Sequence, residues 1–223
     1  MRLVLLGLPG AGKGTQGERI AAEYSIPHIS TGSIIRSVIA SKSSLGMEVN
    51  GYISKGNLIP DHLAVDIVRE RLVQDDCQGG WILDGYPRTV KQAENLDAAL
   101  QREAMALDLA FDIRISEPEA IGRIAQRRMC RQCGITYHLT YYRTQVEGIC
   151  DRCGGELYRR ADDTESTARQ RLKVYMLQTH PVVHYYAQSG RLYSVDGDRP
   201  IDDVFQDVKE VLANLQSIPC VGS

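Results

Sequence analysis

Long apolar runs, an excess of one charge and internal repeats are all missing from this sequence of 223 residues. Without an apolar run long enough to span a bilayer, the chain is not expected to have a membrane partner. Its 26 Lys and Arg oppose 28 Asp and Glu, which leaves a formal net charge of -2. Such a balance lacks the electrostatic footprint of a dedicated nucleic-acid binder, so no nucleic-acid partner is expected. The length suits one domain with insertions.

The two ends of the sequence carry little information. The first ten residues, MRLVLLGLPG, have the outline of a weak signal peptide. Their apolar run is short and leads straight into a glycine-rich loop, so we reject that interpretation and expect a cytoplasmic protein. The last six residues, IPCVGS, are expected to fray.

The strongest motif is the stretch GLPGAGKGT at residues 7–15, which lies between a short apolar run and a helical pattern. This strand, glycine turn and helix start are typical of a phosphate loop, whose backbone N–H groups and helix N-terminus bind phosphate oxygens. Lys13 would reach the β- and γ-phosphates as a point charge. The usual spacing puts a hydroxyl directly after the lysine, whereas here Gly14 intervenes and the hydroxyl comes from Thr15. An ordinary glycine turn is the weaker alternative.

Apolar runs and helical patterns alternate along the chain. The expected strands are Arg2–Leu6, Pro27–Ile29, Trp81–Leu83, Leu107–Ile115 and Arg191–Val195, and the expected helices lie near 13–24, 61–74, 89–102, 117–128, 163–187 and 201–214. This alternation predicts an α/β fold, a parallel sheet flanked by helices, with ligands beyond the carboxyl ends of the strands. Residues 30–59 and 123–163 interrupt the pattern, and we interpret both as insertions that project over the ligand crevice.

A second motif, WILDGYPRT at 81–89, ends an expected buried strand with Asp84. Such an acidic residue beside a phosphate loop holds Mg²⁺ directly or through water. Gly85 would allow close backbone approach, and Arg88 would bring a guanidinium to the same strand end. The alternatives are an Asp in a strand-to-helix turn and a solvated loop arginine.

The six cysteines are unevenly placed: four form the pattern CRQC-x16-CDRC, while Cys77 and Cys220 stand alone. Two CxxC turns let thiolates converge on one ion, and this separation is typical of a four-cysteine ribbon site. With all four positions filled by sulfur, the metal is expected to be structural. Zn²⁺ is the first choice, although thiolates also accept iron or cobalt. Two free-thiol pairs or a redox pair are the less favoured interpretations.

Ten arginines crowd the second insertion and its borders: Arg123, Arg127, Arg128, Arg131, Arg143, Arg152, Arg159, Arg160, Arg169 and Arg171. Most arginines in such a run are solvated, and a polynucleotide surface is conceivable. Beside a nucleotide loop we favour a clamp on a transferring phosphoryl group, whose charge is spread over its oxygens. The sequence alone does not choose which arginines form it. The five scattered histidines are interpreted as structural or solvated.

The phosphate loop, TGSIIR at 31–36, WILDGYPRT and the cysteine quartet together resemble adenylate kinase over essentially the whole chain, in particular the bacterial long-lid form with a metal ribbon. GKGT is this family's version of the loop. The resemblance implies a phosphate-loop NTPase core of 1–29, 60–122 and 164–223, an AMP-binding insertion at 30–59, and a lid with a metal site at 123–163. It also implies a monomer with structural Zn²⁺ that catalyses ATP + AMP ⇌ 2 ADP with Mg²⁺.

The family's site residues carry over by motif. The resemblance implies ATP contacts at Gly10, Ala11, Gly12, Lys13, Gly14, Thr15, Arg123, Arg127, Thr136, Tyr137 and Arg199. It implies AMP contacts at Thr31, Arg36, Asn57, Leu58, Ile59, Gly85, Arg88, Gln92, Arg160 and Arg171. Catalytic roles are expected for Lys13, Arg88, Arg127, Arg160 and Arg171, a water-mediated Mg²⁺ contact for Asp84, and metal ligation for Cys130, Cys133, Cys150 and Cys153.

Two stretches depart from the family's pattern. Ser33 stands where the family usually has an Asp associated with the charge network near metal and lid, and HLTYYRTQVEG replaces a stretch that more often carries a proline pair. Two other functions stay open. The chain could be a nucleoside monophosphate kinase that prefers CMP, UMP or GMP, although Gln92 and the long lid favour AMP. It could also be a nucleotide switch whose ribbon and arginines bind RNA or a protein.

Overall fold

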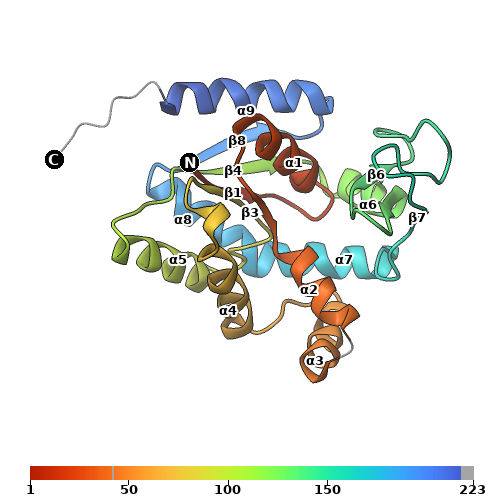
Figure 1. Cartoon of the computed structure of the whole chain (residues 1–223), viewed down its shortest axis with the longest axis horizontal. Coiled ribbons are helices and arrows are strands. Elements are labelled where there is room, and N and C mark those ends of the chain that lie inside the picture. Colours follow the sequence, from red (N-terminus) through yellow and green to blue (C-terminus); the bar gives the residue numbers. More distant parts are fainter. Residues whose placement is uncertain (42, 217–223) are drawn as a thin grey trace.

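The computed structural model describes residues 1–41 and 43–216, so the tail IPCVGS and the lone Cys220 lie outside the described residues. A five-stranded parallel sheet of order β2-β3-β1-β4-β8 occupies the middle of the molecule, with helices on both faces (Figure 1). The strands are β1 Arg2–Leu6, β2 His28–Ser30, β3 Trp81–Asp84, β4 Leu109–Arg114 and β8 Leu192–Asp196. The α/β fold class predicted from the sequence is confirmed.

Alternate side chains of each strand supply the two halves of the core. Leu3 and Leu5 of β1 join the cluster under α1 (Lys13–Tyr24) and α9 (Ile201–Gln216), which lie above the sheet in Figure 1. Val4 and Leu6 join the cluster on the opposite face, which α4 (Asp61–Leu72), α5 (Val90–Arg102) and α8 (His180–Gln188) cover. Burial on both faces explains the unbroken apolar runs of these strands.

The predicted helices match the structure within two residues at each end, except for the pattern at 163–187. Helix α6 (Glu117–Gln126) ends before the predicted residue 128, because Arg127 already begins a strand. The pattern at 163–187 is divided into α7 (Glu165–Val174), a π-helical segment η2 (Tyr175–Thr179) and α8. Among the described helices, none combines the length and the apolar character needed to cross a membrane.

The first insertion forms a helical pair with a core of its own. Helix α2 (Thr31–Ala40) begins after Ser30, and α3 (Ser44–Ile53) begins after Ser43; each of these serines caps its helix by accepting a backbone N–H. Ile35, Val49 and Ile59 are buried together between this pair and α4. The pair projects away from the sheet, as Figure 1 shows, and the short 3₁₀ turn η1 (Asp75–Cys77) follows α4.

The second insertion carries a small antiparallel sheet of order β6-β5-β7. Its strands are β5 Arg127–Cys130, β6 Thr136–His138 and β7 Leu157–Tyr158. Cys130, Tyr137 and Cys150 form a separate buried cluster. Ile135 and Leu157 pack against this cluster, so sulfur and an aromatic ring provide much of its buried interior.

Candidate active site

The phosphate loop lies between the end of β1 and the start of α1, at the carboxyl edge of the sheet. Gly10 and Gly12 have φ of +91° and +93°, a left-handed conformation that favours glycine. A Cβ at Gly10 would also lie 2.8 Å from the Ala120 carbonyl oxygen. No side chain caps α1. The first backbone N–H groups of this helix are therefore available to an anion.

Lys13 folds back onto its own loop. Its Nζ donates hydrogen bonds to the carbonyl oxygens of Gly7 and Leu8, at 2.7 and 2.9 Å. Burial, partly offset by the nearby Asp84 carboxylate, lowers the pKa of Lys13 to about 8. A phosphate chain that replaced the two carbonyls would favour the charged ammonium.

Asp84 lies beside the loop because β3 pairs with β1 in the register Leu5↔Asp84. Its Oδ2 is 3.5 Å from His28 Nε2, and a Cβ at Gly14 would lie 3.7 Å from the same oxygen. Burial acts to raise the pKa of Asp84, but His28 and Lys13 outweigh it and lower that pKa below its usual value. Asp84 is therefore ionised near neutral pH. The sequence predicts a structural or solvated His28, whereas its contact with Asp84 places it at the site.

Four arginines from separate segments converge on the same side of the loop: Arg36 from α2, Arg127 from β5, Arg160 after β7 and Arg171 from α7. Burial, followed by the charges of Arg127 and Arg36, lowers the pKa of Arg160. Burial and neighbouring arginines act on Arg171 in the same way. The cluster is thus a region of strong positive potential that a polyphosphate would neutralise.

Asp163 supplies the negative charge inside this cluster, and its side chain is 0% exposed. The carboxylate accepts hydrogen bonds from Arg127 Nη2 and, at 2.9 Å, from Arg127 Nε. Arg171 Nη1 lies 3.4 Å from the same carboxylate and Arg171 Nη2 donates to Asp162. Asp163 is not among the site residues predicted from the sequence. In RRADD the two aspartates follow two arginines after Ala161, but this local pattern does not identify Arg127, 36 residues away, as the partner of Asp163.

Seven of the ten residues expected to bind AMP lie at the ends of β2 and β3 and on the first insertion; the others are Gln92 of α5, Arg160 after β7 and Arg171 of α7. Thr31 donates its hydroxyl to the Asp84 carbonyl at 3.1 Å, and Arg88 Nε donates to the Gly85 carbonyl at 2.6 Å. Gly85 has φ +82°, and a Cβ there would lie 2.7 Å from the Thr31 hydroxyl. Arg36 donates to Ser33 Oγ at 2.9 Å, so the serine occupies a polar position at the cavity.

Two of the residues expected to bind ATP, Arg123 and Arg199, lie at the end of α6 and just before α9. Arg123 forms an ion pair with Glu119 at 2.7 Å and donates to the Gly197 carbonyl at 2.9 Å. Its guanidinium also lies 5.2 Å from the ring centroid of Tyr141, which stacks on His138 at 4.7 Å. Arg199 forms ion pairs with Asp203 and Asp207.

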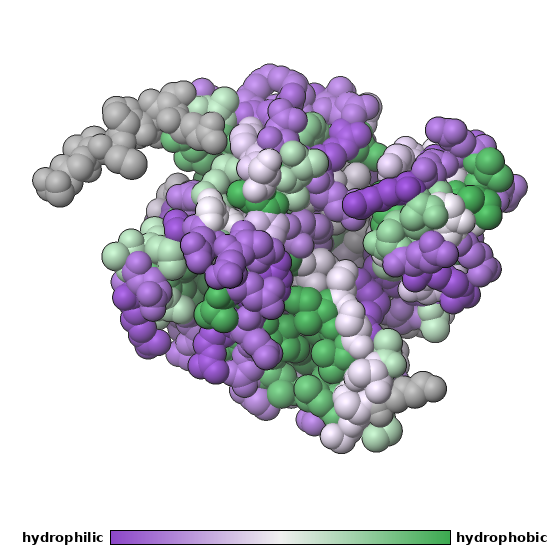
Figure 2. Space-filling view, in the orientation of Figure 1, coloured by the Kyte–Doolittle hydropathy of each residue, from purple (hydrophilic) through white to green (hydrophobic). Residues whose placement is uncertain are grey.

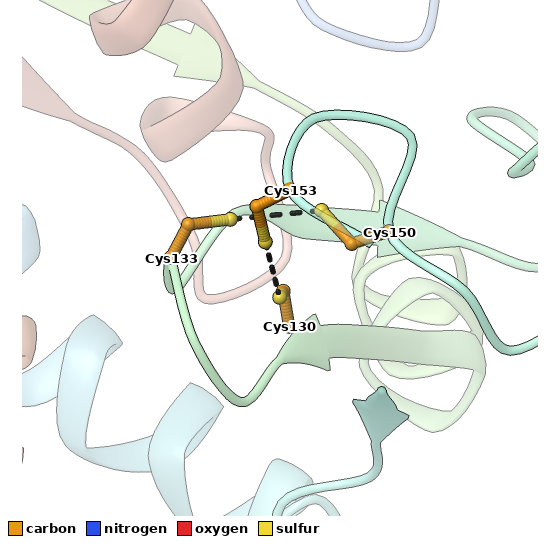
Figure 3. Close-up of side chains that lie close together, drawn as sticks. All are labelled: Cys130, Cys133, Cys150 and Cys153. Carbon is orange, nitrogen blue, oxygen red and sulfur yellow. Dashed lines mark hydrogen bonds between the residues drawn. The ribbon is translucent and has the colours of Figure 1, made fainter. Parts of the chain in front are cut away.

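The cysteine quartet converges in the second insertion, as Figure 3 shows. Cys130 Sγ lies 3.4 Å from Cys153 Sγ, and Cys133 Sγ lies 3.6 Å from Cys150 Sγ. All four sulfurs are within 4.8 Å of one another. Four thiolates at Zn–S distances of about 2.3 Å around a tetrahedral ion would be about 3.8 Å apart, so the donor set fits a four-sulfur metal site. The Tyr137 hydroxyl lies 3.4 Å from Cys150 Sγ.

One cavity of about 1080 Å³ joins these parts. It is lined by every residue expected to bind ATP, by Asp84, and by most of those expected to bind AMP. Thr31, Ile59 and Gln92 line a smaller adjoining hollow instead. Of the quartet, only Cys133 reaches the cavity wall among the residues that the structure describes. The cysteine quartet is therefore mostly separate from the cavity.

Comparison with known proteins decides the family. A family model described as "Adenylate kinase" matches residues 5–191, more than half of the 223 residues. The chain belongs to the adenylate kinase family. The adenylate kinase of Bacillus subtilis (strain 168) is 49% identical over 216 residues, which cover 97% of this chain and 100% of that protein.

Two other adenylate kinases are similar over a comparable span. That of Bacillus velezensis is 48% identical over 215 residues, 96% of this chain and 99% of the relative. That of Clostridium acetobutylicum is 49% identical over 215 residues, 96% of this chain and 100% of the relative. The likeness to adenylate kinases therefore includes both insertions as well as the sheet.

Proposed function

We propose that this chain transfers the γ-phosphoryl group of ATP to AMP, reversibly and with Mg²⁺, to give two ADP. Membership of the adenylate kinase family supports this reaction. The structural observation that best supports this reaction is the shared lining of the main cavity. A phosphate loop, an ionised Asp84 and four arginines from four segments all line it. Such a site suits a reaction in which two phosphorylated substrates meet.

On the donor side, the loop from Gly10 to Thr15 would bind the ATP phosphates through its backbone N–H groups. Lys13 would exchange its two carbonyl partners for β- and γ-phosphate oxygens. The lid residues Arg123, Thr136 and Tyr137, with Arg199 opposite, would enclose the base and ribose. Magnesium bound with the nucleotide supplies positive charge at the β- and γ-oxygens, and Asp84 would hold it through water.

On the acceptor side, the AMP phosphate would lie between Arg36 and Arg88, with its base over the insertion and Gln92. An oxygen of that phosphate attacks the γ-phosphorus in line, while the bond to the β-γ bridging oxygen breaks and ADP leaves. Arg127, Arg160 and Arg171 would neutralise the charge that develops on the equatorial oxygens. No protein nucleophile is needed, because catalysis comes from positioning and electrostatics.

Water competes with AMP as an acceptor, and closure of both insertions would exclude it. We infer a core of 1–29, 60–122 and 164–223, an AMP-binding insertion at 30–59 and a lid at 123–163. The four-sulfur site supports a structural Zn²⁺ in that lid, with no position left for substrate. A cytoplasmic monomer completes this proposal.

The proposal is tested by measuring phosphoryl transfer from Mg·ATP to AMP, CMP, UMP and GMP. We expect a strong preference for AMP, and a loss of at least about a hundredfold in turnover for Lys13→Met. Lys91→Met is the matched control, because that lysine is 70% exposed and pairs with Glu94 on the surface. Near-normal turnover of Lys13→Met would contradict the role of this lysine. Salt-dependent RNA binding without transfer to any acceptor would favour a nucleotide switch instead.

A further inference from the structure

The side-chain amide of Gln92 is held at both of its ends. Its Nε2 donates to Asp61 Oδ1 at 2.6 Å, and its Oε1 accepts the backbone N–H of Arg88 at 2.7 Å. The other carboxylate oxygen of Asp61 accepts the Thr89 hydroxyl at 3.1 Å. Gln92 is only 2% exposed, so water does not compete for these groups.

These partners leave the amide only one favourable orientation. A carboxylate accepts hydrogen bonds and a backbone N–H donates them. If the amide turned by 180°, its oxygen would face the Asp61 carboxylate and its NH₂ group would face the Arg88 N–H. Both hydrogen bonds would become repulsive contacts between buried groups. Each such loss disfavours the turned state by about tenfold to a hundredfold.

Gln92 lies in a hollow whose walls are mostly aliphatic, with Thr31, Tyr86 and Arg88 as its other polar or aromatic members. Ile35, Ile53 and Leu58 line it, and these three residues also line the main cavity, so the two spaces are continuous. Figure 2 shows an apolar area between α4 and the α2–α3 pair, the elements that form this hollow. A flat, mostly apolar base in the main cavity would reach these walls from its edge. Thr31 donates its hydroxyl to the Asp84 carbonyl, and Arg88 can only donate. The Gln92 amide is therefore the side chain here that offers a donor and an acceptor together.

The orientation of the amide decides which edge it can pair with. After its hydrogen bonds to Asp61 and to the Arg88 N–H, the amide still has one free N–H and one free lone pair of Oε1. Adenine presents an amino donor beside a ring-nitrogen acceptor, which a glutamine amide pairs with through two hydrogen bonds. Guanine carries the acceptor O6 in place of that amino group. Its O6 would face the acceptor Oε1, and the locked amide could not turn to donate instead.

We propose that Asp61 is a positioning residue that locks the Gln92 amide and thereby makes the acceptor site select adenine over guanine. The inference rests on the proposed function in one respect, namely that Gln92 contacts the AMP base. Asp61 is also the first residue of α4, where a carboxylate favours the helix N-terminus. Both of its oxygens, however, bond side chains at the start of α5, which a role in α4 alone would not require.

Asp61→Asn tests the lock, because its amide can either accept from Nε2 or donate to Oε1. The turned state then loses only the Arg88 hydrogen bond. We expect the ratio of kcat/KM for AMP to that for GMP to fall about tenfold or more, with KM for ATP unchanged. A ratio within twofold of wild type would overturn the proposal. Asp66→Asn is the matched control on the same helix, since that side chain is 64% exposed, and it should leave the ratio unchanged.

Gln92→Leu separates this inference from the proposed function. Unchanged kcat/KM for AMP in Gln92→Leu would contradict the base contact itself. If Gln92→Leu lowers it, then Asp61→Asn should no longer change the AMP:GMP ratio in the Gln92→Leu background. A further fall in that background would show that Asp61 acts by another route and would overturn the lock. If Asp61→Asn fails to fold by thermal melting, Asp61→Ser replaces it, because a hydroxyl also donates or accepts.

Discussion

Asp163→Asn is the substitution that most directly tests how the arginine cluster is held. The Asp163 carboxylate is 0% exposed and accepts hydrogen bonds from Arg127, with Arg171 at 3.4 Å. The asparagine has nearly the same shape but no charge, and its NH₂ group would face a guanidinium. The substitution therefore leaves converging arginines without their buried counter-charge.

The expected loss of stability follows from the burial of this pair. Removing one partner of a buried ion pair costs about 3–5 kcal/mol, because the other charge is left uncompensated. For a domain of this size each kcal/mol lowers Tm by about 2–4 °C, so Tm should fall by about 6–20 °C. Asp202→Asn is the matched control: Asp202 pairs with Arg19 at 2.6 Å but is 85% exposed, and surface pairs contribute at most about 1 kcal/mol.

Thermal unfolding with and without tripolyphosphate is the assay. The ligand's negative charges replace those of the missing carboxylate, so we expect tripolyphosphate to raise Tm more in Asp163→Asn than in wild type. A fall in Tm no larger than that of Asp202→Asn would refute the argument, because the arginines would then not depend on Asp163. An equal rise in Tm with tripolyphosphate in both proteins would contradict the predicted link between Asp163 and the phosphates.

Two further predictions concern the metal and pH. The double variant Cys133→Ser, Cys153→Ser should have a Tm about 8–16 °C below that of the wild type measured with zinc at a thousandfold its Kd. Its rate of phosphoryl transfer should change far less. Equal melting temperatures of the wild type with and without metal would contradict the structural role. Because the pKa of Lys13 is about 8 in the folded chain and 10.5 unfolded, its contribution to stability rises as pH increases through that interval. ATP favours the charged ammonium, so binding near pH 8–9 should take up protons in calorimetry with two buffers, and Lys13→Met should abolish that uptake.

The main sheet could be predicted because each of its strands carries its own signal. Strand β1 occupies the predicted Arg2–Leu6, and Trp81–Leu83 is extended only by Asp84. A buried parallel strand is an apolar run, whatever surrounds it. The division of 163–187 carried no such local signal. At the end of the π-helical segment, the Thr179 hydroxyl donates to the Arg88 carbonyl at 3.0 Å, a contact between residues far apart in the sequence.

The lid sheet was missed for a related reason. Its strands have two to four residues, and strand β5 reads RRMC, which shows no alternation of apolar and polar positions. Strand β5 pairs with β7 through Met129↔Tyr158 and Cys130↔Leu157, residues far apart in the sequence, whereas the CxxC spacing predicts only a metal site there. Local hydrophobic pattern is a weak guide where sulfur and aromatic rings form the interior.

The residues of the candidate site also differ in whether the local sequence predicts them. Residues in contiguous motifs, such as the loop around Lys13, could be placed at one cavity from the sequence, although their individual roles stay predictions. His28, Asp61 and Asp163 could not, because each gains its importance from a partner 31 or more residues away. A single acidic or imidazole side chain carries no sign of such a partner.

The lid's separate interior has an evolutionary consequence. Its buried cluster of Cys130, Tyr137 and Cys150 shares no residue with the two clusters that hold the main sheet to its helices. The chain enters the lid after α6 and leaves it before α7. Substitutions confined to this small cluster can therefore accumulate without touching the residues that hold the main sheet to its helices. Selection can act on the interior of this segment separately from Arg127 and Arg160, which line the cavity.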